Sequence, residues 1–161
     1  MIIIGLDMAT KRTGFSVLKD NELIDYGNID GNKNDDFRAR IKTICAEIEN
    51  LIIKYKPDIV FIEDVPIIKK DMHSSTSLLF IMQGYILHMV DKYNIEYNLF
   101  MPGTWRSKLG IATQPKEGAK QGTVDWVNNE FNLNFIYKKD SVKSDDNITD
   151  AIGVACCGLL R

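Results

Sequence analysis

The first thirty residues alternate between apolar runs and short polar turns. Residues 2–7 form a short apolar run rich in β-branched side chains, which predicts a strand. Residues 13–19 and 22–29 are also strand-like, and the Asp20-Asn21 pair between them is typical of a tight turn. We therefore expect a meander of three antiparallel strands at the start of the chain.

The pattern then changes to that of alternating helices and strands. Apolar residues keep helical spacing over residues 36–55, and residues 58–63 form a near-continuous apolar run, typical of a strand covered on both faces. Further on we expect a helix over 74–93, a strand over 95–101, and helices over 117–132 and 145–160. This order predicts an α/β fold with a mixed sheet and helices on both faces.

Composition adds bounds on size and location. The chain has 161 residues, 45% hydrophobic and 26% charged, and no repeat or linker divides it, so residues 1–161 are expected to form a single domain. Cys45, Cys156 and Cys157 have no metal-binding spacing and indicate free thiols in a reducing cytosol. Polar residues such as Gln83 interrupt the helix at 74–93, so no membrane span and a cytoplasmic protein are expected.

The charge distribution leaves two interpretations open. The net charge is −2, which by itself does not indicate a nucleic-acid partner. Between residues 102 and 122, however, one anion accompanies four cations, namely Arg106, Lys108, Lys116 and Lys120. Such a strip suits a polyanion held in a groove, and it equally suits a solvated loop and helix face.

Three carboxylates stand at the edges of apolar elements. Asp7 ends the first strand, Glu63 ends the strand at 58–63, and Asp150 lies in the apolar last helix. Carboxylates brought together repel unless a cation holds them, and Mg²⁺ prefers oxygen ligands. Two such ions can clamp the attacking water and the leaving oxygen of a phosphodiester.

Each acidic position also has an ordinary structural explanation. Asp7 suits the turn after its strand, and Glu63 with Asp64 suits a solvated strand end. Asp145 and Asp146 suit the first turn of a helix, where negative charge complements the helix dipole. Asp150 is harder to explain in this way, because its neighbours are small and apolar.

The ordered set of motifs resembles the RuvC-type Holliday junction resolvases of the ribonuclease-H-like superfamily. Gly-Leu-Asp at the start of residues 5–14, Val-Phe-Ile-Glu-Asp-Val at 60–65 and the Asp-Ala pair inside 146–155 are similar to the three acidic motifs of that family. Gln83-Gly84, Trp105-Arg106 and Lys120 are similar to its intervening segments. The segment Trp-Arg-Ser-Lys-Leu-Gly-Ile at 105–111 looks more like phage-borne members.

The resemblance implies a metal site made of carboxylates. Asp7, Glu63 and Asp150 would bind two Mg²⁺ ions, for which Mn²⁺ would substitute, and no organic cofactor is implied. The fourth ligand is expected to be Asp146, which is four residues before Asp150 on one helix face, with Asn147 as the alternative.

The resemblance also assigns two cations, Lys120 and Arg106, to the DNA phosphates, and each equally fits an ordinary surface cation. Lys120 would neutralise charge at the scissile phosphate and is counted with the catalytic group. The expected DNA-contacting cations are Lys69, Lys70, Arg106, Lys108, Lys116 and Lys120. The loop after the second motif lacks the family's aromatic wedge, so Ile67, Ile68 or Met72 is either an apolar wedge or an ordinary loop residue.

The helix at 74–93 is apolar almost all round, which indicates a second buried face. This face is either a two-fold dimer contact or the surface of a central helix inside one domain. Because paired nicks across a junction need two active sites, the resemblance favours a homodimer. Its substrate would be four-way or other branched DNA, in bacterial or phage-infected host cytoplasm, during recombination and repair.

Other functions are compatible with parts of this pattern. An RNA-processing nuclease of the same fold and a non-catalytic junction-binding protein remain alternatives. Actin-like sugar kinases share a similar opening strand and turn, but they need a second phosphate-binding repeat and a much longer chain. The sequence thus favours a Mg²⁺-dependent endodeoxyribonuclease.

Overall fold

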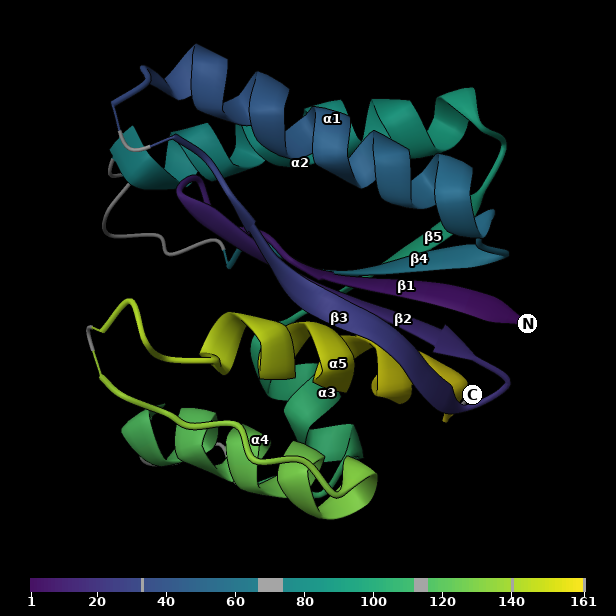
Figure 1. Cartoon of the computed structure of the whole chain (residues 1–161), viewed down its shortest axis with the longest axis vertical. Coiled ribbons are helices and arrows are strands. Elements are labelled where there is room, and N and C mark those ends of the chain that lie inside the picture. Colours follow the sequence, from purple (N-terminus) through teal and green to yellow (C-terminus); the bar gives the residue numbers. More distant parts are fainter. Residues whose placement is uncertain (33, 67–73, 112–115, 140, 161) are drawn as a thin grey trace.

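The computed structural model describes residues 1–32, 34–66, 74–111, 116–139 and 141–160; the side chains of residues 74, 75, 116 and 117 are also outside this description. Five strands form one mixed sheet in the order β3-β2-β1-β4-β5. The strands are β1 (Ile2–Asp7), β2 (Arg12–Lys19), β3 (Glu22–Asp30), β4 (Ile59–Glu63) and β5 (Glu96–Phe100). Figure 1 shows helices above and below this sheet.

The predicted meander is confirmed. β1 pairs with β2 and β2 with β3, both antiparallel, while β4 is parallel to β1 and β5 to β4. Asp20 and Asn21 both have positive φ angles, of 50° and 73°, as expected for a two-residue hairpin turn whose twist matches the flanking strands. This is the α/β arrangement predicted from the order of the elements, and it is the ribonuclease-H-like fold that the family resemblance implied.

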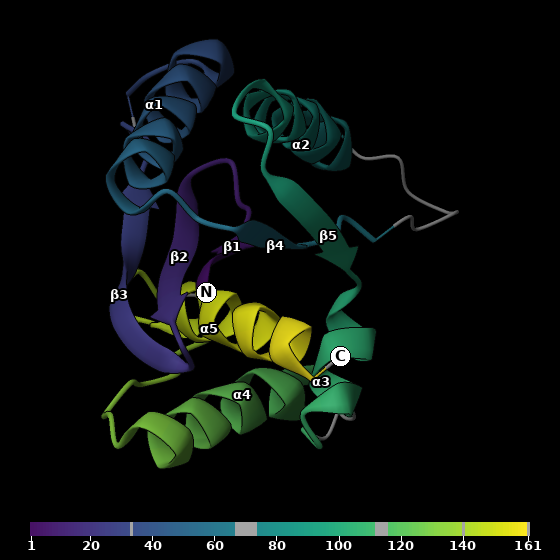
Figure 2. The same cartoon turned by 90° about the vertical axis from the view of Figure 1, so that its right-hand side faces the viewer.

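Two helical layers cover the sheet (Figure 2). One consists of α1 (Phe37–Tyr55) and α2 (Ser74–Lys92). The other consists of α3 (Pro102–Lys108), α4 (Lys116–Phe131) and α5 (Asp146–Leu159). Along β1, Ile4 and Leu6 pack toward the first layer and Ile3 toward the second, because successive side chains of a strand point to opposite faces.

α3 was not predicted from the sequence. The segment contains a proline and a glycine, which suggested an irregular connection, but Pro102 stands at the first helical turn, where its missing N–H costs nothing. The other predicted helices and strands are present, with ends that differ by one or a few residues.

α5 lies unusually close to the sheet. A Cβ placed on Gly5 would come within 2.2 Å of the Ala151 carbonyl oxygen, and one on Gly14 within 1.9 Å of the Asn147 carbonyl oxygen. Ser16 Oγ donates a hydrogen bond to Ala151 O at 2.9 Å. The glycines of β1 and β2 therefore allow the polar first turns of α5 to approach the end of β1 that carries Asp7.

The remaining expectations on composition concern the cysteines and the membrane. Cys45, Cys156 and Cys157 are free and buried. Within the described ranges, none of the helices has the length and apolar character needed to span a lipid bilayer.

Candidate active site

The carboxylates predicted from the sequence meet at one edge of the sheet. Asp7 and Glu63 are the last residues of β1 and β4, which lie side by side and parallel. Asp146 and Asp150 are one helical turn apart at the start of α5, the helix that packs across both strands. The Asp150 residue is only 2% exposed and Asp7 is also buried.

The electrostatics of this cluster confirm that the carboxylates are close together. Burial, followed by the charges of Glu63 and Asp150, raises the pKa of Asp7 well above its ordinary value. Burial and the charge of Asp150 raise the pKa of Glu63 to about 7, against the opposing effects of Arg106 and Trp105. Burial also raises the pKa of Asp150. The cluster therefore favours the binding of positive charge.

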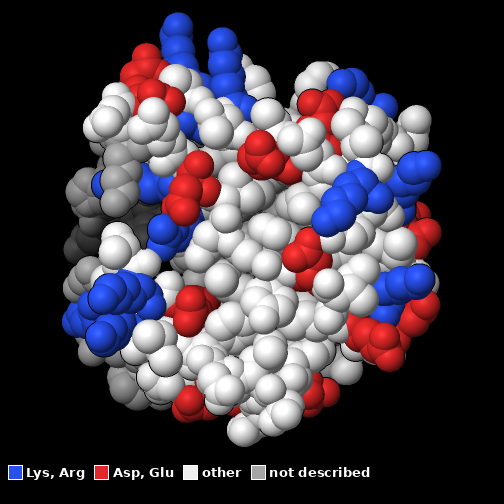
Figure 3. Space-filling view, in the orientation of Figure 1, with Lys and Arg blue, Asp and Glu red and all other residues white. Residues whose placement is uncertain are grey.

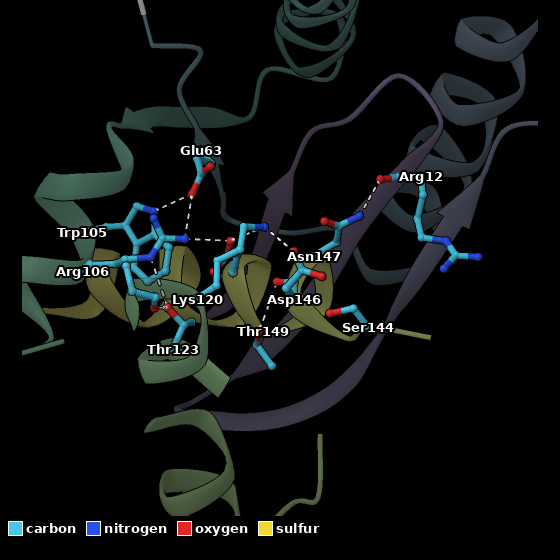
Figure 4. A network of polar contacts seen from close by, with 12 residues as sticks. Arg12, Glu63, Trp105, Arg106, Lys120, Thr123, Ser144, Asp146, Asn147 and Thr149 are labelled. Carbon is cyan, nitrogen blue, oxygen red and sulfur yellow. Dashed lines mark hydrogen bonds and ion pairs between the residues drawn. The ribbon is translucent and has the colours of Figure 1, made fainter. Parts of the chain in front are cut away.

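Arg106 from α3 is the buried cation of the site. Its Nη2 lies 2.7 Å from Asp150 Oδ2 and 3.9 Å from Glu63 Oε2, and its Nε donates to Thr123 Oγ1 at 3.1 Å (Figure 4). Its guanidinium carbon lies 4.3 Å from the centre of the Trp105 ring. Arg106 was predicted as a DNA-contacting residue, and the structure shows that it also orients two of the carboxylates.

Lys120 from α4 contacts the other end of the cluster. Its Nζ is paired with Asp146 Oδ2 and lies 3.8 Å from Asp150 Oδ2 (Figure 4). Burial lowers the pKa of Lys120, but the charges of Asp150 and Asp146 outweigh this effect and the pKa is raised. For Asp146, burial raises the pKa, but the bond from Lys120 and other hydrogen bonds lower it overall.

The two candidates for the fourth ligand have different surroundings. The side chain of Asn147 points away from Lys120 toward β2, where its Nδ2 donates to the Arg12 carbonyl oxygen at 3.0 Å (Figure 4). Asp146 instead faces Lys120. Asp145, the residue before the helix, accepts a hydrogen bond from the Ile136 N–H at 3.0 Å. Of these three residues, only Asp146 is in contact with the cluster.

The other predicted DNA-binding residues are not all at this site. Lys108 is exposed, with its Nζ 5.5 Å from the centre of the Phe100 ring, and its charge acts on Cys157 at the far end of α5. Lys69, Lys70 and the possible wedge at residues 67, 68 and 72 lie outside the described residues, as does the side chain of Lys116.

Two residues that support the site, Trp105 and Thr123, were missed by the sequence analysis. Trp105 Nε1 donates to Glu63 Oε2 at 2.8 Å, and Thr123 Oγ1, which accepts from Arg106, itself donates to the Ala119 carbonyl oxygen at 2.9 Å. The only available signal was the position of Trp105 directly before Arg106. Trp105 and Thr123 come from α3 and α4, so their role depends on how these helices pack against the sheet and α5.

The donor atoms fit a hard divalent cation. Asp150 Oδ1 is buried and finds no hydrogen-bond partner within the described part of the chain. The donors are carboxylate oxygens, which Mg²⁺ and Mn²⁺ prefer. In the described residues no three acidic, His or Cys side chains are already gathered in coordination geometry, and the cations Arg106 and Lys120 contact the carboxylates instead. These carboxylates therefore suit a metal, and its binding requires the ion pairs with Arg106 and Lys120 to rearrange.

Comparison with known proteins identifies the family. Residues 3–158 match the family described as "Crossover junction endodeoxyribonuclease RuvC". The protein of that name from Petrotoga mobilis is 28% identical over 98% of this chain and 92% of its own length. The one from Rickettsia africae is 32% identical over 65% of this chain and 68% of its own. These relatives are bacterial and give no support to membership of a phage-borne subgroup.

Solved structures show the same fold. Thermus thermophilus RuvC in complex with a Holliday junction substrate superposes with a TM-score of 0.78 at 14% identity, covering 99% of this chain and 93% of that one. The yeast mitochondrial Holliday junction resolvase gives a TM-score of 0.61 at 15% identity, with 98% and 77% coverage. With the match over residues 3–158 and the acidic cluster at the sheet edge, this chain belongs to the RuvC family of crossover junction endodeoxyribonucleases.

Proposed function

We propose that residues 1–161 form one nuclease domain that cuts four-way DNA junctions by metal-dependent hydrolysis of phosphodiester bonds. Asp7, Glu63, Asp146 and Asp150 are the proposed ligands of two Mg²⁺ ions, for which Mn²⁺ substitutes. The observation that carries this proposal is the buried carboxylate cluster, in which Asp150 Oδ1 has no hydrogen-bond partner within the described residues. Burying several carboxylates together costs free energy, and it raises their pKa values. Clusters of this kind are typical of functional sites, and a bound cation would offset the cost.

The protein's own side chains have distinct proposed roles around the metal. When bound, the divalent ions supply an activated water and neutralise charge on the scissile phosphate and the leaving oxygen. Trp105 and Arg106 hold Glu63 and Asp150 in place through the contacts described above. Lys120, which is half-buried beside Asp146, contacts the scissile phosphate and stabilises its developing charge. No nucleophilic side chain is required.

We further propose a homodimer formed through α2 and the adjacent edge of the sheet. On α2, Phe80, Ile81 and Tyr85 are exposed, and on the neighbouring β5 so are Tyr97 and Leu99. Tyr85 alone is 58% exposed. An apolar surface of this kind is typical of a protein interface. Two-fold pairing places two active sites on one junction and gives paired, symmetric nicks.

Met82 is not part of this proposed interface. It is fully buried in the core between α1, α2 and the sheet, so a charge there disrupts folding rather than dimerisation. Among the described side chains of α2, the large apolar ones available to a second copy are Phe80, Ile81 and Tyr85.

Proposed substrate recognition rests on two supports. The Thermus thermophilus relative has been solved with a Holliday junction substrate, and the cations of this site suit phosphates. Contacts to phosphates do not distinguish one base sequence from another. The substrate is therefore selected by the four-way geometry of the junction and by how easily its DNA deforms.

The test uses a synthetic four-way junction, labelled in turn on each strand, with and without Mg²⁺, resolved on a denaturing gel. We expect two nicks at symmetric positions in opposed strands, and only with the metal. A matched RNA–DNA hybrid tests the alternative of an RNA-processing nuclease, which predicts preferential cutting of the hybrid. Tight junction binding with no cutting in Mg²⁺ or Mn²⁺ would instead indicate a non-catalytic junction-binding protein.

A further inference from the structure

A groove of about 910 Å³ adjoins the carboxylate cluster. Its walls come from the β1–β2 connection, the end of β3, the start of α1 and the loop between α4 and α5. It shares two residues with the active site, Lys120 and Asp146, and Asn147 also lines it. On the left of Figure 3, Lys and Arg side chains border a hollow at this position. None of the other cations in it was predicted from the sequence.

One ion pair builds the wall of this groove. Arg12 donates to Asp30 from Nε at 2.5 Å and from Nη2 at 3.2 Å, and its Nη1 donates to the Val142 carbonyl oxygen at 2.7 Å. The charges of Arg12 and Asp30 therefore largely cancel. The ion pair joins the start of β2 to the end of β3, and the bond to Val142 ties the start of β2 to the loop before α5. Asn147 also bonds the Arg12 carbonyl oxygen, so this wall is held by several contacts.

Three other cations in the groove keep their charge. Arg40 donates from Nε to the Thr10 carbonyl oxygen at 3.2 Å and from Nη1 to the Asp35 carbonyl oxygen at 2.7 Å. These contacts fix the guanidinium without neutralising it, and they use two of its five N–H donors. Lys11 and Lys138 are exposed, and neither forms an ion pair with another described residue. The groove therefore has an excess of positive charge next to an acidic centre.

We infer that this groove binds the sugar–phosphate backbone of the DNA strand next to the scissile phosphate, with Lys11, Arg40 and Lys138 contacting successive phosphates. This inference rests on the proposed function. The groove continues directly from Lys120 and Asp146, so a strand cut at the carboxylates has to continue into it or leave the protein surface. Cations placed side by side along a groove position a nucleic-acid backbone through its phosphates and do not contact its bases.

The test compares two double variants of equal charge. Lys11→Ala/Lys138→Ala removes the two unpaired lysines of the groove. Lys19→Ala/Lys42→Ala removes two exposed lysines that do not line it. Junction binding is measured in a chelator between 50 and 200 mM salt. Each lost phosphate contact lowers the salt slope by about 0.9. Over this fourfold change in salt, the groove variant should lose roughly twelve-fold less affinity than the control.

Neutral linkages in the DNA test the location of the contact. Methylphosphonates at the two linkages on one side of the scissile phosphate, and in a second junction on the other side, remove the charges that the groove would meet. On one of the two sides they should reduce the salt slope of the wild type more than that of the groove variant, because the contacts of Lys11 and Lys138 are already lost in the variant. Equal, additive effects in both proteins on both sides would overturn the assignment.

The inference and the proposed function fail separately. If the wild type cuts junctions in Mg²⁺ but the groove variant keeps the salt slope of the control, the groove assignment is wrong and the proposed function stands. If the slope falls as expected but the wild type cuts no junction in Mg²⁺, the proposed function is wrong and the groove still binds DNA backbone.

Discussion

The two helical layers of this protein differ in what they bury and what they expose. The layer of α1 and α2 covers the sheet with apolar side chains, apart from Gln83, whose Nε2 donates to Asp64 Oδ1 at 2.9 Å. It then exposes apolar side chains on the outer face of α2. The layer of α3, α4 and α5 has a similar apolar core but buries charges at one end, including Asp150 and Arg106, which is 7% exposed.

This difference shows which unfavourable feature each layer carries in the isolated chain. Buried charges are costly unless they are paired, and the pKa values of Asp7, Glu63 and Asp150 are all raised. The apolar side chains exposed on α2 are unfavourable because they remain in contact with water. The proposed metal ions and DNA would relieve the first cost, and the proposed second copy of the chain would relieve the second.

The largest expected effect is on the charged end of the second layer. Asp150→Asn keeps the shape of the side chain but removes a charge and weakens metal binding, so cleavage should fall at least a hundredfold or so. Junction binding should stay near that of the wild type. Asp145→Asn is the matched control, because Asp145 bonds the Ile136 N–H outside the cluster. Rates are measured in single turnover; similar rates in the two variants would contradict the metal assignment.

The next largest effect is expected from charges placed on the exposed apolar face of α2. Ile81→Glu or Tyr85→Glu places an unpaired carboxylate in the proposed interface, which should raise the dimer dissociation constant by roughly a hundredfold. Ile24→Glu is the control, because Ile24 is 44% exposed on β3, at the sheet edge opposite β5. Sedimentation equilibrium measures the association. A dimer that withstands both α2 variants would place the interface elsewhere.

A third prediction tests how closely α5 approaches the sheet. Gly14→Ala forces a methyl group against the Asn147 carbonyl oxygen, at 1.9 Å without rearrangement. We expect a loss of about 2 kcal/mol or more in the free energy of unfolding, and weaker cleavage, because the first turn of α5 has to shift. Gly103→Ala, with no heavy atom within 4 Å of its new methyl group, should be nearly neutral. Urea unfolding compares the two variants.

The smallest expected effect is the pH dependence of stability. The folded-state pKa of Glu63 is about 7, above its ordinary value of 4.5, so the folded protein binds more protons than the unfolded chain between these values. Stability should therefore fall as the pH rises through this window in the presence of a chelator. In Glu63→Gln this fall should be smaller by on the order of 1 kcal/mol. Parallel stability curves for the two proteins would contradict the raised pKa.

Much of the fold was predictable from the sequence because its signals are local. The β2–β3 hairpin was predicted from its two-residue turn at Asp20-Asn21. The strands β1 and β4 were predicted from their apolar runs. Asp7 and Glu63 were found because each ends an apolar strand. Asp150 was found because it interrupts an apolar helix face.

Features made by packing were not predictable. Trp105 reaches Glu63, 42 residues earlier in the chain, only because α3 packs against α5. Lys11, Arg40 and Lys138 come from three separate segments, so no spacing in the sequence relates them. The short α3 was missed because its proline and glycine are typical of an irregular connection.

In the proposed dimer, each protomer has its own complete carboxylate centre. Contacts between the two α2 helices place both centres on one junction. A mixed dimer of one wild-type and one Glu63→Gln protomer, isolated with two affinity tags, tests both parts at once. We expect the mixed dimer to make a single nick in one of the two opposed strands, against two nicks by the wild-type dimer and none by the doubly substituted dimer. Two symmetric nicks by the mixed dimer, or none, would contradict the proposal.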